Sequence, residues 1–145
     1  MQAREFVSVA TCDFEGRPNA ASKFLLKVDQ KHVYLIDYII GRTFQNLKIN
    51  PRASISFLDA DSLIGYQLNG RAVIIDSGAE FERILKELHQ RQIDLSTKRI
   101  IEGVTKGKVH EGFEVSIPEN FVILKFGIEE VVEMGADGII RRQNV

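Results

Sequence analysis

Residues 37–52 read Asp-Tyr-Ile-Ile-Gly-Arg-Thr-Phe-Gln-Asn-Leu-Lys-Ile-Asn-Pro-Arg and predict a short helix between two strands. Gly41 indicates a turn, and the residues after it show helical spacing. The helix is expected to end just before Pro51, because the residue that precedes a proline is disfavoured in the α conformation. The flanking runs, 33–36 and 53–58, are rich in β-branched and aromatic residues, which is typical of strands.

The start of this helix carries groups from which an anion site can be built. The first amides of a helix have no partner within the helix, and their partial positive charge attracts phosphate. Arg42 adds a planar set of donors suited to phosphate, and Thr43 adds a hydroxyl. The same residues also fit an ordinary helix start, with Thr43 as the cap and Arg42 in water. The local sequence leaves both interpretations open.

The composition is that of an ordinary globular protein and argues against several classes of function. A length of 145 residues predicts one domain, residues 1–145, and a net charge of -1 gives no attraction for nucleic acid or an anionic membrane. No apolar run approaches the roughly 20 residues that span a bilayer, and the N-terminus lacks the apolar stretch of a signal peptide. The single cysteine, Cys12, excludes an internal disulfide and a cysteine-based metal cluster. We therefore expect a cytoplasmic protein with no membrane or nucleic-acid partner.

Alternating apolar residues and short connections predict a mainly β chain. The first three strands should form an antiparallel meander, because short loops join them. Glycines at positions 65 and 70 indicate a bulge, a bend or the close approach of another group. The expected strands are 6–12, 19–28, 33–37, 53–58, 64–75 and 121–126, then an extension or further strand over 128–134 and a last strand or tail over 139–145.

Two helical segments complete the prediction. Over 78–91 the pattern changes to a helical period, with Phe81, Ile84, Leu85 and Leu88 on one face. A further short helix is one interpretation of 94–103, and 106–119 stays undecided. Strands in this number, with helices between them, predict an antiparallel β-barrel with flanking helices outside it.

Motifs of the common enzyme classes are missing from the sequence. Neither the Walker spacing of glycines nor the dinucleotide-binding spacing occurs, and no serine lies in a nucleophile elbow. His32, His89 and His110 show no metal-ligand spacing, so we expect them in solvent. We assign no catalytic residue and no metal site.

Five short motifs follow one another in the order of a known family. They are Gly16-Arg-Pro18, Ser22-Lys-Phe24, Gly41-Arg-Thr43, Asn50-Pro-Arg52 and the glycine-containing strand from Gly65 to Ala72. With this order and spacing the chain resembles the flavin-binding split barrels related to pyridoxamine 5′-phosphate oxidase. The resemblance implies an antiparallel split β-barrel that binds flavin mononucleotide (FMN) at the interface of a homodimer.

The resemblance also implies which residues contact the flavin. The second strand would run along the ring and ribityl chain, the helix start would hold the phosphate, and the long strand of the second subunit would complete the pocket. The ten residues implied are Ser22, Lys23, Phe24, Asp37, Tyr38, Gly41, Arg42, Thr43, Tyr66 and Gln67. The chain departs from the true oxidase, because it has no tryptophan and Arg141-Arg142 stand in an unrelated context.

Three functions follow from the resemblance and its departures. The leading hypothesis is a small FMN-dependent oxidoreductase, distinct from pyridoxamine 5′-phosphate oxidase, that passes electrons or hydride through the flavin. The second is a non-catalytic module that binds flavin, deazaflavin or heme as a store or sensor. The third is a structural or interaction protein that kept the barrel without a cofactor, for which the Asp37 carboxylate beside an anionic ligand leaves room.

Overall fold

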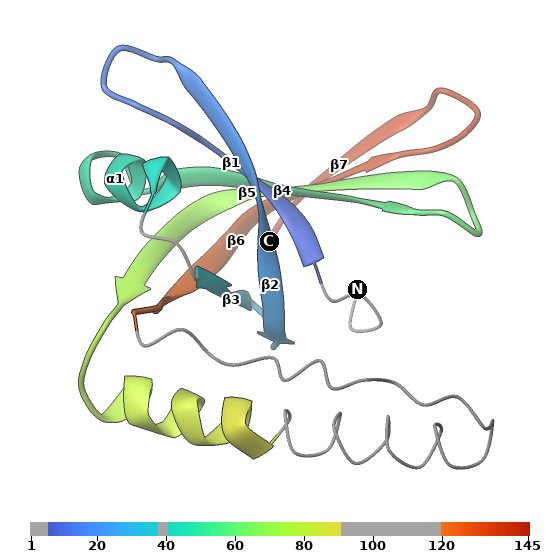
Figure 1. Ribbon diagram of the computed structural model, residues 1–145. Coiled ribbons are helices and arrows are strands. Elements are labelled where there is room, and N and C mark those ends of the chain that lie inside the picture. Colours follow the sequence, from blue (N-terminus) through green and yellow to red (C-terminus); the bar gives the residue numbers. More distant parts are fainter. Residues whose placement is uncertain (1–5, 38–40, 91–119) are drawn as a thin grey trace, which may run out of the picture. The chain divides into compact units, whose positions relative to one another are not determined.

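An antiparallel β-barrel is the main part of this computed structural model, which describes residues 6–37, 41–90 and 120–145 (Figure 1). The chain divides into two compact units, Met1–Asp76 with Asn120–Val145 and Ser77–Glu119. The barrel belongs to the first unit. The expectation of one domain over residues 1–145 stays a prediction.

The strands expected from the sequence are present, and their ends agree to within about a residue. The runs expected at 121–126 and 128–134 form one continuous strand. The elements are β1 (Phe6–Cys12), β2 (Pro18–Val28), β3 (His32–Asp37), α1 (Arg42–Ile49), β4 (Arg52–Asp59), β5 (Ile64–Ile75), β6 (Val122–Met134) and β7 (Ile140–Asn144).

The strands follow one another around the barrel in the order β3-β2-β1-β4-β5-β6, and β6 pairs with β3 to close it. The predicted meander of β1, β2 and β3 is confirmed, because each pairs antiparallel with the next. One edge of β6 pairs with β5, whereas the other edge pairs first with β3 and then with β7. The prediction of a mainly β, antiparallel split barrel is therefore confirmed.

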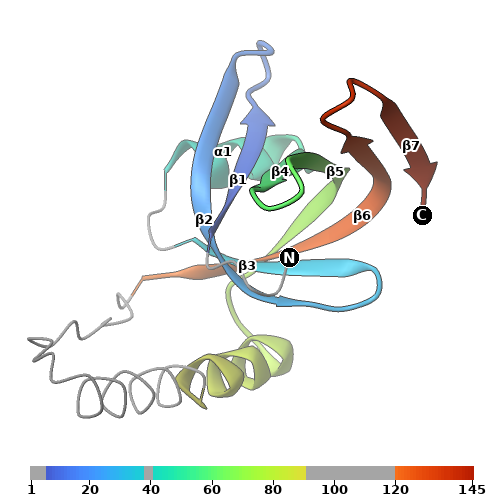
Figure 2. The ribbon, with the colours of Figure 1, turned by 90° about the vertical axis from the view of Figure 1, so that its right-hand side faces the viewer.

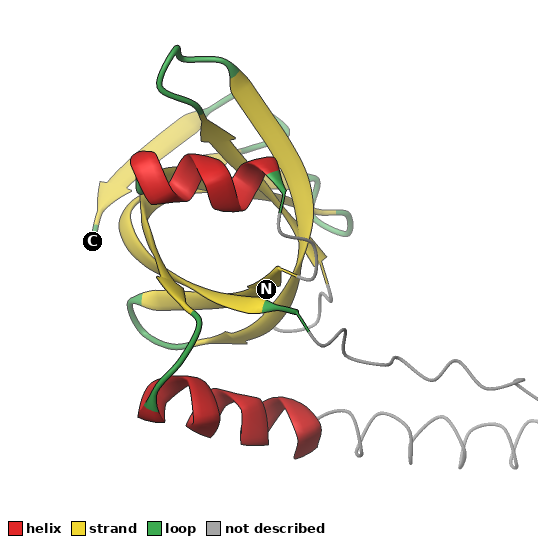
Figure 3. Ribbon diagram, turned by 60° about the vertical axis from the view of Figure 1, so that its left-hand side comes forward, coloured by secondary structure: helices red, strands yellow, loops and turns green. Residues whose placement is uncertain are grey.

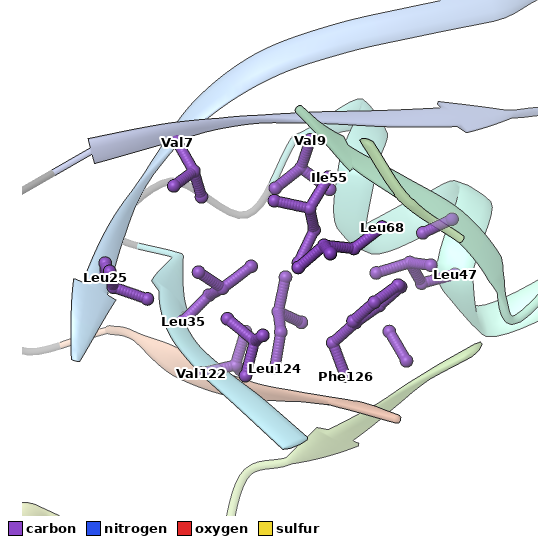
Figure 4. Packing of buried hydrophobic residues seen from close by; sticks show 13 residues of the cluster. Val7, Val9, Leu25, Leu35, Leu47, Ile55, Leu68, Val122, Leu124 and Phe126 are labelled. Carbon is purple, nitrogen blue, oxygen red and sulfur yellow. The ribbon is translucent and has the colours of Figure 1, made fainter. Parts of the chain in front are cut away.

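The core fills the inside of the barrel, because side chains alternate between the two faces of each strand. Val7 and Val9 point inward from β1, and Leu124 and Phe126 point inward from β6 (Figure 4). These side chains are at most 3% exposed. Burial of such apolar surface is the main favourable term in the stability of the barrel.

Helix α1 lies at one end of the barrel (Figure 3). Its Leu47 side chain joins the barrel core and is 5% exposed. The next strand, β4, then pairs with β1 rather than with β3. The helix thus carries the chain from one side of the barrel to another, and its first turn lies close to the start of β2.

Three hairpins extend beyond the barrel, formed by β1–β2, β4–β5 and β6–β7 (Figures 1 and 2). Large apolar side chains are exposed near their turns, including Phe14, Leu63 and Ile139. The hairpins therefore present apolar surface away from the barrel core.

Of the alternatives predicted for Gly70, the structure shows both a bulge and a close approach. The ladder between β5 and β6 shifts register between Asn69 and Gly70, which indicates a bulge. A Cβ atom at Gly70 would overlap the carbonyl oxygen of Gly127 and would lie 3.1 Å from the Phe126 ring. Backbone atoms cannot yield as a flexible side chain can, so the two strands need glycine here.

Gly70→Ala is expected to destabilise the protein by about 1–3 kcal/mol, because the added methyl group must push β5 and β6 apart. Gly65→Ala on the same strand is the matched control. Its Cβ would meet the Cε atom of Met134 at 3.3 Å, which is the far end of a flexible side chain. Urea unfolding of both variants measures the difference, and equal midpoints would contradict the packing at Gly70.

The second unit contains a helix over residues 79–90. It confirms the predicted start at residue 78 to within one residue, and the expected apolar face includes the buried Ile84 and Leu88. The predicted end at residue 91 lies outside the described residues. The interpretations for 94–103 and 106–119 lie outside the described residues. Among the helices that the structure describes, none has the length and apolar character needed to cross a membrane.

Candidate functional site

The start of α1 presents the hydrogen-bond donors of its first turn and of Arg42. Gly41 is the N-cap, in an extended conformation with φ -122° and ψ -152°, and no side chain of the described residues caps the helix. The first turn contains no acidic residue, and Arg42 is exposed at the first helical position. The interpretation of Thr43 as the cap is therefore wrong. The first amides of α1 and the Arg42 guanidinium together suit an anion such as phosphate.

Thr43 instead points toward the barrel and is 2% exposed. Its Oγ1 accepts a hydrogen bond of 3.1 Å from Nδ2 of Asn19, at the start of β2. One turn later, Nδ2 of Asn46 donates a bond of 3.1 Å to Oγ1 of Thr11, at the end of β1. The inner face of α1 is thus bound to the barrel through polar side chains.

Sequence reasoning did not assign Thr11, Asn19 or Asn46 to the site. The signal that could have identified Asn46 is its spacing, because it lies three residues after Thr43 and next to Leu47, on the same face of the helix. A polar residue on the buried face of a short helix requires a partner. Thr11 and Asn19 could be recognised as those partners only from the packing of α1 against β1 and β2.

Lys23 and Asp37 meet inside the barrel. Lys23 precedes the core residue Leu25 by two positions and Asp37 follows the core residue Leu35 by two, so both side chains face inward. Lys23 Nζ donates to Asp37 Oδ1 at 2.8 Å, and the two side chains are 9% and 1% exposed. The structure thus brings these two predicted residues together as a buried ion pair.

The side chains of Ser22 and Phe24 lie on the opposite face of β2 from Lys23, because neighbouring strand residues alternate. Ser22 is exposed, and the half-buried Phe24 ring meets Phe6 edge-on at a centroid distance of 5.6 Å. The three predicted residues of β2 therefore divide between the outside and the inside of the barrel. One ligand can contact the side chains of Ser22 and Phe24 without contacting that of Lys23.

Tyr66 and Gln67 on β5 also face in opposite directions. The Tyr66 ring stacks on Phe57 of β4 at a centroid distance of 5.2 Å, and Gln67 Nε2 donates to Asn69 Oδ1 at 2.9 Å. Asn69 in turn donates to Glu130 of β6. That the second subunit supplies Tyr66 and Gln67 to the site stays a prediction, and Tyr38 lies outside the described residues.

The motif Gly16-Arg-Pro18 forms the turn that leads into β2. Asp13 holds this turn, because its Oδ1 accepts hydrogen bonds from the backbone amides of Glu15 and Arg17 at 2.9 Å. The side chain of Arg17 also donates to Asp13, and this bond lowers the pKa of the Asp13 carboxyl. Gly16 supplies the positive φ of 80°. The motif therefore fixes the residue at which β2 begins, and with it the position of Asn19.

No cluster of three or more metal-ligating side chains occurs in the described part of the chain. His32 lies at the start of β3, with Nδ1 3.2 Å from Asp29 Oδ1, and His89 is exposed. His110 lies outside the described residues. Groups suited to an organic cofactor lie at the start of α1 and on the outer face of β2.

The comparisons with known proteins agree with the fold. The family described as "Pyridoxamine 5'-phosphate oxidase" matches residues 1–134. None of the curated proteins compared with the chain matches it.

Solved structures share the fold at low sequence identity. A Clostridium acetobutylicum protein related to general stress protein 26 has 19% identity and a TM-score of 0.70, and the match covers 99% of this chain and 88% of that one. A pyridoxamine 5′-phosphate oxidase-related, FMN-binding protein from Nostoc punctiforme has 15% identity and a TM-score of 0.58, with 97% and 87% covered. A heme-binding protein from Mycobacterium smegmatis has 19% identity and a TM-score of 0.60, with 99% and 54% covered.

Proposed function

The chain belongs to the pyridoxamine 5′-phosphate oxidase family, and from this premise we propose that it binds FMN and acts as a small oxidoreductase. The observation that carries the proposal is the start of α1. It combines an exposed Arg42 with a first turn that has no acidic residue and that no described side chain caps. A phosphate monoester fits these donors, because it is an anion with several acceptor oxygens.

The chain's own residues would bind and orient the cofactor. Arg42 and the first amides of α1 would hold the phosphate, and the outer face of β2, with Ser22 and Phe24, would run along the rest of the flavin. Bound FMN supplies hydride or electron transfer through its ring. Lys23 would act from inside the barrel, by fixing Asp37 and the end of β3 beside the site.

A homodimer is part of the proposal. Apolar side chains such as Phe6 and Val73 are 57% and 60% exposed within a single chain, and a second copy would cover surface of this kind. Light scattering of the purified protein measures its mass. A mass equal to that of one chain, with FMN bound, would contradict the dimer and leave the cofactor proposal standing.

We expect the protein to bind FMN at one per subunit and more tightly than riboflavin, which lacks the phosphate. The measurements are the visible absorption spectrum of the purified protein and titrations with both compounds. Anaerobic addition of a nicotinamide nucleotide, followed by an acceptor, then tests turnover. Flavin that is bound but never reduced by any donor would overturn the oxidoreductase proposal and support a binding module.

Heme is the second candidate, because the heme-binding protein from Mycobacterium smegmatis aligns with 99% of this chain. A heme titration in the same buffer distinguishes the two cofactors. Saturable binding of heme together with no saturable binding of FMN would overturn the flavin proposal. A protein that binds neither compound would support a structural or interaction role for the barrel.

A further inference from the structure

Two side-chain hydrogen bonds, one buried and one partly buried, connect α1 to β1 and β2 of the barrel. Thr11 on β1 and Asn19 on β2 are cross-strand partners, and Thr43 and Asn46 lie three residues apart on one face of α1. Asn19 donates to Thr43, and Asn46 donates to Thr11, each over 3.1 Å. Each of the two strands therefore binds one residue of the helix.

This contact is more polar than attachment of the helix alone would require. The buried residues of α1 are Thr43, Asn46 and Leu47, and only the last is apolar. Apolar contacts would attach a helix without fixing its rotation, because the hydrophobic effect has no direction. Hydrogen bonds are directional, and a buried polar group without a partner is costly, so α1 is restricted to orientations that keep both bonds.

A third bond fixes the other end of the helix. Nδ2 of Asn50, the C-cap residue, lies 3.4 Å from Sγ of Cys12, next to Thr11 on β1. The backbone amide of Asn50 also donates to the carbonyl of Asn46 at 2.7 Å. The polar contacts at Thr43, Asn46 and Asn50 therefore run the length of α1 and hold it against shift and rotation.

We propose that Thr11, Asn19 and Asn46 are positioning residues. They set the position and rotation of α1 relative to the barrel, and with it the position of the groups that recognise phosphate. The inference rests on the proposed function, since it assigns the phosphate to Arg42 and the first turn of α1. Arg42 is directly followed by Thr43, whose side chain Asn19 holds. A small rotation of the helix would move the guanidinium and the first amides together, away from the position that a bound phosphate requires.

The test compares FMN with riboflavin, because their difference isolates the phosphate. The double variant Thr11→Val and Asn46→Leu removes both partners of one bond, keeps the branching and the number of heavy atoms of both side chains, and leaves no unsatisfied donor, so the fold should be retained. We expect its preference for FMN over riboflavin to fall about tenfold, which is about 1.4 kcal/mol, and its riboflavin affinity to stay unchanged. Thr11→Ser keeps the hydroxyl and is the matched control, so its preference should equal that of the wild type.

Asn19→Ala gives a second measurement at a half-buried position, should the double variant fail to fold. Its preference for FMN should fall in the same direction. An unchanged preference in these variants, while Arg42 variants lose theirs, would overturn the positioning role and leave the proposed function intact. A wild type that binds FMN and riboflavin equally well would overturn the phosphate site and this inference together.

Discussion

Arg42→Glu is expected to lower the affinity for FMN about a hundredfold or more and to change the affinity for riboflavin by less than about threefold. The variant removes charge-assisted hydrogen bonds worth about 1.5–3 kcal/mol and adds a carboxylate that repels the phosphate, so the two effects add. Isothermal titration with both compounds measures the difference. The fold should be retained, because an acidic side chain in the first turn of a helix interacts favourably with the helix dipole.

Lys48→Glu is the matched control for Arg42→Glu. Lys48 is also exposed on α1, but it lies in the last turn. The substitution makes the same change in net charge, so it reproduces any effect of overall charge on the binding of an anion. Equal losses of FMN affinity in the two variants would contradict a phosphate site at the start of the helix, as would an Arg42→Glu variant that binds FMN normally.

Asp37→Asn is expected to lower the free energy of unfolding by about 3–5 kcal/mol. Asparagine keeps the shape of the aspartate but leaves the Lys23 ammonium inside the barrel without a counter-charge, and an unpaired buried charge is strongly destabilising. Replacing the pair together, by Lys23→Met and Asp37→Asn, should regain most of the lost stability. Urea unfolding of the three proteins measures this coupling.

The surface pair Arg71–Glu129 is the control for Asp37→Asn. Its atoms approach to 3.2 Å, close to the 2.8 Å of the buried pair, but its side chains are 55% and 53% exposed. Glu129→Gln should therefore cost less than about 1 kcal/mol. A loss at Asp37→Asn as small as that at Glu129→Gln, or a double variant no more stable than Asp37→Asn, would show that burial of the pair has no energetic consequence.

Much of the fold can be predicted from local sequence, because apolar residues recur with a different period in strands and in helices. The alternation within 64–75 predicts β5, and the glycine at position 70 predicts a bulge, a bend or a close approach to a neighbour. The closing of the barrel could not be predicted in the same way. The pairing of β3 with β6 joins residues about 90 positions apart, and no local pattern records which distant strand completes a barrel.

The residues of the candidate site could be predicted from the sequence more fully than their arrangement in space. The exposed Arg42 and the turn at Gly41 follow from the start of a helix that the sequence shows directly. The period of two already implies that Ser22 and Lys23 face opposite ways, but which of them faces the core depends on the register with β1. The hydrogen bonds of Thr43 and Asn46 depend on how α1 lies against the strands, which a single sequence does not specify.

The pairing of β3 with β6 also determines when the barrel can close during synthesis of the chain. The last strand of the barrel, β6, begins at Val122, about 85 residues after β3 ends at Asp37. Until Val122–Gly127 leaves the ribosome, β3 has no partner along the edge that β6 later covers, and such an edge can pair with other chains. Because long-range contacts form slowly, aggregation competes most strongly with the closure of the barrel. A molecular chaperone would therefore be most useful to the barrel before it closes.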